Sequence, residues 1–512
     1  MATHNIQADG AVVLAELLPD IPVPESMAGL PVNDLVQDSR HVRPGAAFIA
    51  LQGSHGHGLS HAADAAERGA SLILWDEGEA PATKPGVALL HVPGLRARLP
   101  HLAQTIFGSW PAAAPVVAVT GTDGKTTVSH LVAWALEVLG WPTALIGTLG
   151  VGRPGRLTGT GHTTPGTLEL HRHLAALAGS GCRAAALEAS SHGLAQGRLA
   201  GIPISVAVLT RLSSDHLDFH GSQEAYAAAK ARLFAWPGLQ AAVLNADDPF
   251  GRQVARTVAP EVRVLLYSAS AAGNAELRAR DVEASPEGLQ FTLETTAGAW
   301  QVRSRLFGLF QVSNLLATLA ALQALGIAME RAVAAVTELP GVAGRMERFS
   351  LPNGALVVVD YAHTAAALQA ALEALRPHAS RRLGVVFGCG GERDRGKRAA
   401  MGRVACVGAD SVLVTDDNPR SEDPAAIRAE IIAGCDGPAR CDQVADRAEA
   451  IARALHEAEA GDVVLVAGKG HETTQEVQGV HHPFSDREAI RAWVTTWYEQ
   501  GRNSRRGAWG EV

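Results

Sequence analysis

The segment VVAVTGTDGKTT, residues 116–127, decides which class of fold this sequence encodes. Its first part, VVAVT, is apolar and β-branched, which predicts a buried strand, and a helical pattern follows from Thr126 to Leu139. Between them lies a glycine-rich loop made of Gly121, Thr122, Asp123, Gly124, Lys125, Thr126 and Thr127. Glycines let backbone N–H groups face phosphate oxygens, while a following Lys-Thr pair supplies a cation for the phosphates and a hydroxyl for Mg²⁺. The segment therefore predicts a phosphate loop at the carboxyl edge of a parallel sheet.

Strand and helix patterns alternate along the rest of the chain, which is typical of an α/β fold with parallel sheets. Short apolar runs predict strands at Ala47 to Leu51, SLILW, AAALEAS, ISVAVLT, AAVLNA, ALVVVDY, RLGVVFG, SVLVTDD and DVVLVAG. Periodic patterns predict further helices in HAADAAERGA and at Gln223 to Phe234, Ser313 to Leu325 and Ala328 to Thr337. The last four strands, with helical patterns between them, are enough for a separate doubly wound, Rossmann-like domain.

The length of 512 residues predicts about three domains. Breaker-rich segments mark two boundaries, GSWPAAAP at residues 108–115 and the Pro- and Gly-containing stretch near residue 342. We expect a first domain over residues 1–110, a central phosphate-loop domain over 111–342 and a C-terminal Rossmann-like domain over 343–500. Residues 501–512 are expected to form a basic, solvated tail that contains Arg502, Arg505 and Arg506.

Composition narrows the class of protein further. Apolar residues make up 47% and charged residues 19% of the chain, as in soluble globular proteins, and the net charge of −8 gives no field that would attract nucleic acid. The five cysteines are odd in number and lack C-x-x-C spacing, so neither a disulfide framework nor a structural zinc site is expected. No apolar run approaches the ~18 residues of a membrane span, and we expect a cytoplasmic protein without membrane insertion.

Polar residues that could bind a metal ion or take part in catalysis follow other strands of the predicted central sheet. Glu188 stands at the end of the strand in LEASSHG, and His216 follows the next strand, in LSSDHLDFHG. The carboxyl ends of parallel strands share one crevice, so these two residues and the phosphate loop together suit Mg²⁺ and phosphate. Taken alone, His220 is read as an ordinary histidine, and Lys230 in EAYAAAKARLF as a solvated helix lysine.

Taken in order, these motifs resemble those of the Mur ligases, enzymes of peptidoglycan precursor synthesis. The matching segments cover nearly the whole chain: QDSRHVRPGAAFIAL, TGTDGKTT, HTTPGTLEL, LEASSHGLAQGRL, DHLDFHG with AYAAAK, NADD, FQVSNLLATLAAL, PGVAGRMER, DYAHT, FGCGGERDRGKR, TDDNPR and VLVAGKGHE. The resemblance implies a monomeric ligase with three domains that hold, in order, a UDP-sugar, ATP and an incoming amino acid.

Within that family, the resemblance is closest to the members that add diaminopimelate. It implies ATP-dependent ligation of meso-2,6-diaminopimelate to the D-glutamyl carboxylate of UDP-N-acetylmuramoyl-L-alanyl-D-glutamate, with Mg²⁺ and through an acyl phosphate. ADP and phosphate would be released, and the product would serve cell-wall synthesis and thereby cell shape and division.

The resemblance also assigns candidate residues to each ligand. Those for the UDP-muramoyl dipeptide are Ser39, Ser54, His55, Gly56, Thr163, Thr164, Ser190, Gln196 and Arg198. Those for ATP are Gly121 to Thr127, Asn314, Arg345 and Asp360, and those for diaminopimelate are Arg393, Asp417, Asn418, Pro419, Arg420, Gly468 and Glu472. The implied catalytic residues are Lys125, Glu188, His216 and Lys230, and the implied magnesium ligands are Thr126, Glu188, His216 and Lys230, the last carried as a carbamate (N6-carboxylysine).

The chemistry of amide formation explains why these residue types are needed. A carboxylate does not react with an amine at neutral pH, so its oxygen must first be phosphorylated, and Lys125 with Mg²⁺ would spread the charge on the transferred group. Diaminopimelate differs from lysine by a distal carboxylate, which suits the planar guanidinium of Arg420, while Asp417 and Asn418 suit an ammonium.

Several alternatives stay open at this point. The nearest are a lysine-adding Mur ligase, against which DNPR argues, and a folylpolyglutamate synthetase, against which the muramoyl-side motifs argue. More distant ones are a phosphate-loop NTPase that drives motion or transport and a non-catalytic uridine-nucleotide-binding protein. Some positions depart from the usual family motifs: Asp123, His162, Arg211, Gln311 and Ala365-Ala366.

Overall fold

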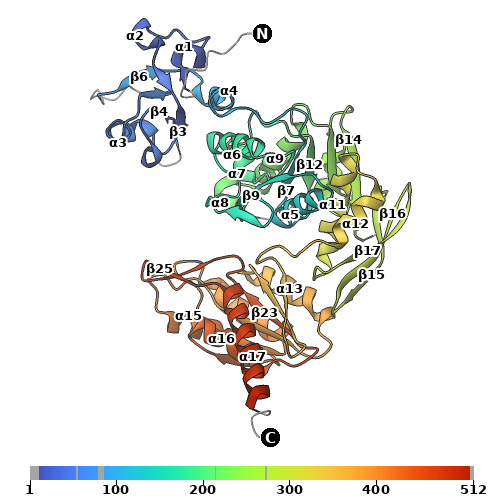
Figure 1. Cartoon of the computed structure of the whole chain (residues 1–512). Coiled ribbons are helices and arrows are strands. Elements are labelled where there is room, and N and C mark those ends of the chain that lie inside the picture. Colours follow the sequence, from blue (N-terminus) through green and yellow to red (C-terminus); the bar gives the residue numbers. More distant parts are fainter. Residues whose placement is uncertain (1–10, 54–55, 79–85, 214, 271–273, 508–512) are drawn as a thin grey trace. The chain divides into compact units, whose positions relative to one another are not determined.

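The computed structural model of the protein describes residues 11–53, 56–78, 86–213, 215–270 and 274–507 (Figure 1). Contacts divide the chain into two compact units, one formed by Met1–Lys125, Leu136–Ala242 and Gln253–Val264, the other by Thr126–Ala135, Val243–Arg252 and Leu265–Val512. Three larger sheets carry the candidate residues, with four strands in the N-terminal part, eleven in the central part and six in the C-terminal part. The class is α/β, as predicted.

The N-terminal part contains a parallel sheet in the order β3-β4-β5-β6. Its strands are β3 Asp34–Val36, β4 Ala46–Ala50, β5 Leu72–Trp75 and β6 Ala88–His91, beside the short pair β1 Val12–Val13 and β2 Pro31–Val32. Its helices are α1 Leu14–Leu17, α2 Glu25–Ala28, α3 Ala62–Glu67 and α4 Leu95–Phe107, with single turns η1 Ser39–His41 and η2 Gly58–His61. Strand β4 is buried throughout because separate apolar clusters pack on its two faces, one around Ile49 and one around Phe48. The strand predicted at Ala47 to Leu51 and the helix predicted in HAADAAERGA are confirmed.

The central sheet has the order β10-β9-β8-β11-β7-β12-β13-β14-β15-β16-β17. Its first strands are β7 Val116–Thr120, β8 Thr143–Gly147, β9 Gly150–Arg153, β10 Arg156–Thr158, β11 Ala184–Glu188, β12 Val206–Leu209, β13 Ala241–Asn245 and β14 Arg263–Ser268. The accompanying helices are α5 Lys125–Val138, α6 Thr167–Gly179, α7 Ser191–Ala195, α8 Leu217–His220, α9 Gln223–Ala231 and α10 Pro249–Ala255. Strands β8, β11, β7 and β12 are parallel and buried at every position, which explains their continuous apolar runs. The helix predicted to end at Phe234 changes to a 3-10 turn, η3 Arg232–Ala235, after α9.

Three antiparallel strands that the sequence did not predict extend this sheet. They are β15 Leu277–Ser285, β16 Gly288–Thr295 and β17 Gly298–Ser304. Their sequences, such as LRARDVEAS, mix buried and exposed positions, whereas the predictions relied on continuous apolar runs. The helices that follow, α11 Phe310–Ala324 and α12 Met329–Thr337, were predicted, and α11 begins slightly earlier than expected.

The C-terminal sheet has the order β18-β19-β23-β20-β21-β22, with only the edge strand β18 antiparallel. Its strands are β18 Glu347–Ser350, β19 Leu356–Asp360, β20 Leu383–Phe387, β21 Ser411–Val414, β22 Arg440–Gln443 and β23 Val463–Ala467, and a separate hairpin contains β24 Thr474–Val477 and β25 Val480–Pro483. The helices are α13 Ala365–Leu375, α14 Gly396–Gly408, α15 Pro424–Ile432, α16 Arg447–Glu457 and α17 Asp486–Gly507, with a turn η4 Arg376–His378. Val358 packs with residues of α13 and α14, whereas its neighbours Val357 and Val359 pack with residues of α16 and α17. Helices therefore cover both faces, and the doubly wound prediction is confirmed.

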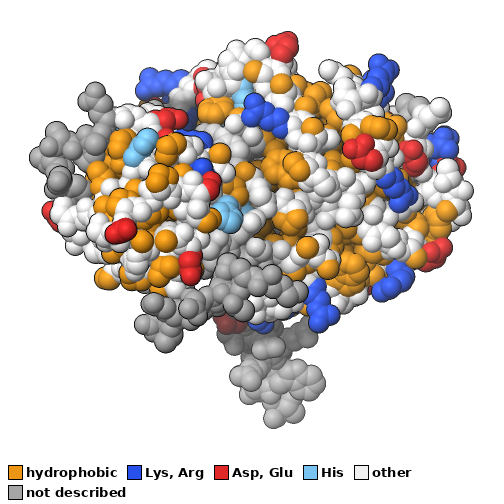
Figure 2. Space-filling view, turned by 90° about the horizontal axis from the view of Figure 1, so that it is seen from above, with side chains coloured by type: hydrophobic (Ala, Val, Ile, Leu, Met, Phe, Trp, Pro, Cys, Tyr) orange, Lys and Arg blue, Asp and Glu red, His pale blue; other side chains and the backbone are white. Residues whose placement is uncertain are grey.

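The C-terminal end is helical as far as the structure describes it, and the expected basic, solvated tail stays a prediction. Helix α17 continues to Gly507, so Arg502, Arg505 and Arg506 belong to a helix, while residues 508–512 lie outside the described part. In the described ranges, no helix is both long and apolar enough to cross a membrane. Figure 2 shows Lys and Arg side chains interspersed with Asp and Glu on the face that it presents.

Candidate active site

Two lysines converge on the phosphate loop. The Nζ atom of Lys125, the first residue of α5, donates to the carbonyls of Gly121 at 2.9 Å and Thr122 at 2.8 Å. The Nζ atom of Lys230, in α9, donates to the same Gly121 carbonyl at 2.7 Å. Lys230 is only 1% exposed, and burial, together with the nearby charge of Lys125, lowers the pKa of its ammonium to about 6. The interpretation of Lys230 as a solvated helix lysine is therefore wrong.

Thr210, directly after strand β12, packs against the phosphate loop. An ideal Cβ on Gly121, where φ is +147°, would lie 1.9 Å from the hydroxyl of Thr210, so only glycine fits there. Thr210 donates to the carbonyl of Asp123 at 2.5 Å, and Thr122 hydrogen-bonds the hydroxyl of Tyr226 at 2.9 Å. The rest of the loop leads into α5 through Gly124, with φ of +82°, and the buried residues Thr126 and Thr127.

Glu188 lies at the end of β11 with its carboxylate held by the end of β8. It accepts hydrogen bonds from the N–H of Thr148 at 2.8 Å and from the hydroxyl of Thr148 at 3.0 Å. An ideal Cβ on Gly147 would lie 2.2 Å from Glu188 Oε1, so a side chain at Gly147 would displace the carboxylate. The strand ends therefore fix Glu188 at the edge of the sheet where ligands bind in such folds.

The residues expected to hold the muramoyl dipeptide form one hydrogen-bonded network with Glu188. The hydroxyl of Thr164 donates to the Glu188 carbonyl at 2.7 Å and accepts from the N–H of Ser190 at 3.0 Å. Arg198 donates to the Thr164 carbonyl at 2.7 Å and to the Gln196 side chain at 2.8 Å. Thr163 joins this network through the hydroxyl of Thr148, at 3.0 Å.

The expected uridine-nucleotide residues lie in the N-terminal part. Ser39 is buried in the turn η1, where its hydroxyl hydrogen-bonds Asp64 and helps to lower the pKa of that carboxyl. Gly56 is exposed, and Ser54 and His55 lie outside the described residues.

His216 lies directly before α8 and contacts α7, the short helix that follows Ser190. It adopts a left-handed backbone conformation, with φ of +52°, and its ring nitrogen lies 3.4 Å from a carboxylate oxygen of Asp215. Its half-exposed ring packs edge-on against His192, with the ring centres 4.8 Å apart, and faces Tyr226 at 6.3 Å. Within the described part of the central sheet, no three His, Cys, Asp or Glu side chains are close enough together to hold a metal ion by themselves.

The available donors nevertheless fit Mg²⁺ in their chemistry. The Glu188 carboxylate and the Thr126 hydroxyl are hard oxygen donors, which Mg²⁺ prefers. The Lys230 ammonium has no free electron pair and cannot bind a cation, whereas a carbamate on that nitrogen would add a carboxylate-like group.

The remaining residues expected to bind ATP are Asn314, Arg345 and Asp360. Asn314 is buried in α11 and donates to the side chain of Gln311 at 2.8 Å. Asp360 ends β19 and accepts from the N–H of Met346 at 2.8 Å; burial raises the pKa of its carboxyl, and the charge of Arg345 opposes that rise. The guanidinium of Arg345 has a buried Nε that finds no hydrogen-bond partner among the described residues, so it is suited to an anionic ligand.

A buried lysine that the sequence did not single out organises the expected amino-acid site. The Nζ atom of Lys469 is fully buried and donates to Asn418 Oδ1 at 2.9 Å and to Glu472 Oε2 at 3.0 Å, with Asp417 Oδ1 3.9 Å away. Asn418 also donates to Glu472 Oε2 at 2.9 Å. An ideal Cβ on Gly468 would lie 2.6 Å from Asp417 Oδ2. The four expected residues thus surround Lys469, whose position between two glycines after strand β23 was the available sequence signal.

The two expected arginines flank Gly390. An ideal Cβ on Gly390 would lie 3.0 Å from Arg420 Nη1 and 3.9 Å from Arg393 Cγ. Arg420 has φ of +52°, donates to the Gly391 carbonyl at 2.7 Å and lies 3.2 Å from a carboxylate oxygen of Glu476. Arg393 is exposed, and Pro419, next to Arg420, is buried.

A second charged residue that the sequence did not reveal lies behind these loops. Arg447 in α16 is fully buried and pairs with Asp486, with N–O distances of 2.7 and 2.8 Å. It also donates to the carbonyl of Ala467 at 2.9 Å and of Asp416 at 3.5 Å. This one side chain therefore joins the end of β23 to the loop that follows β21, which are two segments that carry residues expected to bind the amino acid.

Comparison with known proteins places this arrangement in a family. Residues 32–106 match the Mur ligase family catalytic domain, residues 119–322 the Mur ligase middle domain, and residues 344–470 the Mur ligase glutamate ligase domain. The chain belongs to the Mur ligase family and has its three-domain architecture.

Individual relatives match along almost the whole chain. The UDP-N-acetylmuramoyl-L-alanyl-D-glutamate–2,6-diaminopimelate ligase of Ectopseudomonas mendocina is 47% identical over 476 residues, which is 92% of this chain and 97% of that enzyme. The enzyme of the same name from Xanthomonas campestris pv. campestris is 49% identical over 478 residues, 93% of this chain and 96% of its own. A solved structure of an enzyme of that name has a TM-score of 0.70 at 39% identity and covers 95% of this chain and 99% of its own.

Proposed function

We propose that the protein is an ATP-dependent ligase that joins meso-2,6-diaminopimelate to the D-glutamyl carboxylate of UDP-N-acetylmuramoyl-L-alanyl-D-glutamate. The observation that carries this proposal is 47% identity over 92% of the chain to an enzyme named for ligation of those two substrates. The phosphate loop and the charged loops of the C-terminal sheet supply matching chemistry, since the reaction needs phosphoryl transfer and recognition of an amino acid.

In the first step, the D-glutamyl carboxylate attacks the γ-phosphate of ATP to form an acyl phosphate, and ADP leaves. Lys125 would meet the negative charge on the transferred phosphoryl group, a role that its place at the start of α5 supports. Bound Mg²⁺ would neutralise charge between the two anionic reactants, with Thr126, Glu188, His216 and carbamylated Lys230 as its protein ligands. In the second step, the amine of diaminopimelate attacks the acyl carbon, and phosphate leaves.

The remaining assignments rest on the resemblance of the motifs, and hydrogen-bond networks among the described residues support some of them. Gly121 to Thr127, Asn314, Arg345 and Asp360 would bind ATP, and the unpartnered Nε of Arg345 supports an anion there. Thr163, Thr164, Ser190, Gln196 and Arg198 would hold the muramoyl dipeptide beside Glu188, and Ser39 with the turn Ser54 to Gly56 would contact the UDP-sugar.

The amino-acid site would recognise a zwitterion with an extra carboxylate. Arg420 and Arg393 would bind carboxylates on either side of Gly390, while Asp417, Asn418 and Glu472 would position an ammonium, with Pro419 and Gly468 shaping the loops. Lys469 adds to this set as a positioning residue, because it holds Asn418 and Glu472 together.

The neutral form of a lysine amine is the form that reacts with CO₂ to give a carbamate and a proton. Burial of Lys230 beside Lys125 favours that neutral form and therefore supports the carbamate. We further propose domain boundaries near residues 110 and 342 and around residue 500, a monomeric state, and a cytoplasmic location, because ATP and UDP-sugars are made there.

The test offers the purified protein UDP-N-acetylmuramoyl-L-alanyl-D-glutamate, ATP and Mg²⁺ with either meso-diaminopimelate or L-lysine. Phosphate release and the mass of the nucleotide product are measured. We expect both readouts with diaminopimelate and little of either with lysine. Equal use of both amino acids would favour a lysine-adding or unselective ligase, and phosphate release without a new product would contradict ligation.

A further inference from the structure

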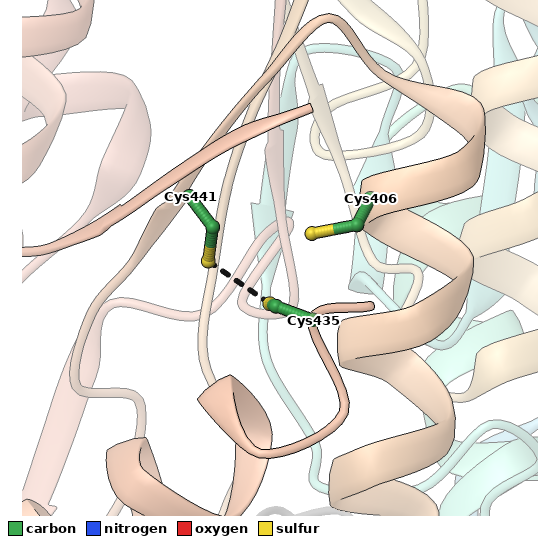
Figure 3. A group of neighbouring side chains, drawn as sticks. All are labelled: Cys406, Cys435 and Cys441. Carbon is green, nitrogen blue, oxygen red and sulfur yellow. Dashed lines mark hydrogen bonds between the residues drawn. The ribbon is translucent and has the colours of Figure 1, made fainter. Parts of the chain in front are cut away.

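Three of the five cysteines lie together in the C-terminal sheet domain, although their spacing predicted no metal site (Figure 3). Cys406 lies in helix α14, Cys435 in the loop after helix α15, and Cys441 in the edge strand β22. Their Sγ atoms all lie within 4.8 Å of one another, and those of Cys435 and Cys441 are 2.9 Å apart. The geometry points to a three-thiolate binding site for a thiophilic cation of the Zn²⁺ or Cu⁺ type.

Close backbone packing holds helix α14 and the loop that carries Cys435 against each other. An ideal Cβ on Gly402, one turn before Cys406, would lie 2.1 Å from the carbonyl oxygen of Ile431. An ideal Cβ on Gly437 would lie 2.7 Å from the Cys406 carbonyl oxygen. These approaches fix the loop that carries Cys435 against helix α14, so the cluster arises from rigid packing of the main chain.

The sulfur positions suit coordination of a cation after small side-chain movements. Zn–S bonds of about 2.3 Å in a tetrahedral site separate two sulfur atoms by about 3.8 Å. The separations between the sulfur atoms, 2.9 Å for Cys435 and Cys441 and at most 4.8 Å for the other pairs, differ from that value by about 1 Å or less. Cys406 is buried, while Cys435 and Cys441 are half-buried, so a cation from solvent reaches the sulfur atoms without unfolding of the domain.

The site lies away from the loop that contains Arg393, one of the residues proposed to bind diaminopimelate. Cys406 is roughly 15 Å along α14 from the start of that helix, which follows the loop containing Arg393. A bound cation would tie together α14, the loop after α15 and the edge strand β22. We therefore expect it to stabilise the C-terminal domain and to leave the reacting groups untouched.

The test titrates Co²⁺ into the reduced, metal-free, full-length protein. A thiolate-to-Co²⁺ charge-transfer absorption is expected to saturate at one ion per chain and to disappear when Zn²⁺ is added. Cations held by oxygen or imidazole ligands do not produce this absorption, so occupation of the proposed magnesium site does not interfere. Cys406→Ser, Cys435→Ser and Cys441→Ser should each weaken Co²⁺ binding by more than roughly 100-fold. Cys182→Ser, at a buried cysteine of the central sheet domain, is the matched control and should bind like the wild type.

Three results would overturn the proposal. The first is the lack of a charge-transfer band in reduced protein that circular dichroism shows to be folded. The second is equal Co²⁺ affinity in the wild type and all three serine variants. The third is oxidation of Cys435 and Cys441 to a disulfide by oxidised glutathione at the same rate with and without Zn²⁺. In that reaction, two thiols lose two protons and two electrons, and the oxidant becomes two glutathione thiols, so the cluster would be a thiol pair that binds no cation.

Discussion

The lysines of the phosphate loop and the lysine of the proposed amino-acid site lie in opposite electrostatic surroundings. At the phosphate loop, Lys125 and Lys230 donate to one carbonyl, that of Gly121, so two amine groups are gathered in one place. In the C-terminal domain, Lys469 lies between an amide and a carboxylate, those of Asn418 and Glu472. At the phosphate loop, the charge of Lys125 disfavours protonation of Lys230. In the C-terminal domain, the carboxylate of Glu472 balances the charge of Lys469.

The difference matches the ligands that we propose for the two regions. Polyphosphate brings several negative charges, so a site that gathers cations gains most of its favourable interactions only when the substrate is bound. An amino acid carries both signs of charge, so its site needs both signs in fixed positions. Removal of a cation at the phosphate loop should therefore cost activity, whereas removal of one partner of a buried, paired charge in the C-terminal region should cost folding stability.

The largest expected effect is on the buried pair of the C-terminal domain. Arg447→Met should lower the free energy of unfolding by about 3 to 5 kcal/mol, because it leaves the fully buried Asp486 carboxylate without its partner. Urea denaturation followed by circular dichroism measures the change. The double variant Arg447→Met with Asp486→Leu should recover most of the loss. A loss below about 1 kcal/mol in the single variant would contradict the view that paired charges hold this region together.

The next effect should appear in the rate and leave stability unchanged. Lys125→Ala is expected to reduce ligation about 10²- to 10³-fold, because the lysine stabilises charge on the transferred phosphoryl group. Phosphate release measures the rate, and the thermal midpoint measures the fold. Arg256→Ala removes an exposed cation of the same part of the chain and should retain the wild-type rate. Near-normal turnover by folded Lys125→Ala protein would contradict the proposal that this loop binds the phosphates of ATP.

A smaller effect should separate the two amino acids. Arg420→Ala is expected to weaken use of diaminopimelate by about 2 to 3 kcal/mol in kcat/KM, the lower part of the range for a partner of a desolvated charge. Use of lysine, which lacks the distal carboxylate, should fall much less. The measurement is kcat/KM for both substrates in both proteins. If the two values fall equally, specificity depends on another group, and Arg393 becomes the next variant to measure.

The sequence predicted the residues of the phosphate loop better than the buried charged residues of the C-terminal domain. The phosphate loop is contiguous, so VVAVTGTDGKTT alone predicted its strand, glycines, lysine and helix, and Glu188 was found because strand ends share one edge. Lys469 and Arg447 were missed because their importance comes from partners in other segments, such as Asn418 and Asp486. Sequence spacing could not bring these partners together.

Two other misses have physical causes of the same kind. The strands β15 to β17 mix buried and exposed residues, so their sequences lack the continuous apolar runs that predict buried strands. The cysteine cluster joins Cys406 to Cys435 and Cys441 only through the packing of α14 on a glycine-containing loop. Composition and motif order thus predicted the architecture, while contacts between distant segments needed the structure.

The last expected effect is a gradual change in how stability depends on pH. The pKa of Lys230 is about 6 in the folded protein, whereas a lysine in an unfolded chain has a pKa of about 10.4. Between these values the unfolded chain binds a proton that the folded chain has released, so this lysine makes wild-type stability rise with pH, by up to about 1.4 kcal/mol per unit. Below about pH 6 both states are protonated, and the contribution is constant.

Lys230→Met removes this titration and should flatten the slope by about 1 kcal/mol per pH unit. The variant should be more stable than the wild type near pH 6.5, and this advantage should shrink as the pH rises towards 9, while ligation is lost. Urea denaturation in CO₂-free buffer measures the slope without interference from a carbamate, and Arg256→Ala should keep the wild-type slope. Parallel curves for Lys230→Met and the wild type would show that Lys230 is protonated in the folded protein at neutral pH. In that case the two neighbouring lysines of the phosphate loop would lower the free energy of unfolding little. The phosphate loop and the C-terminal domain would then differ only in how the loss of a charge affects activity.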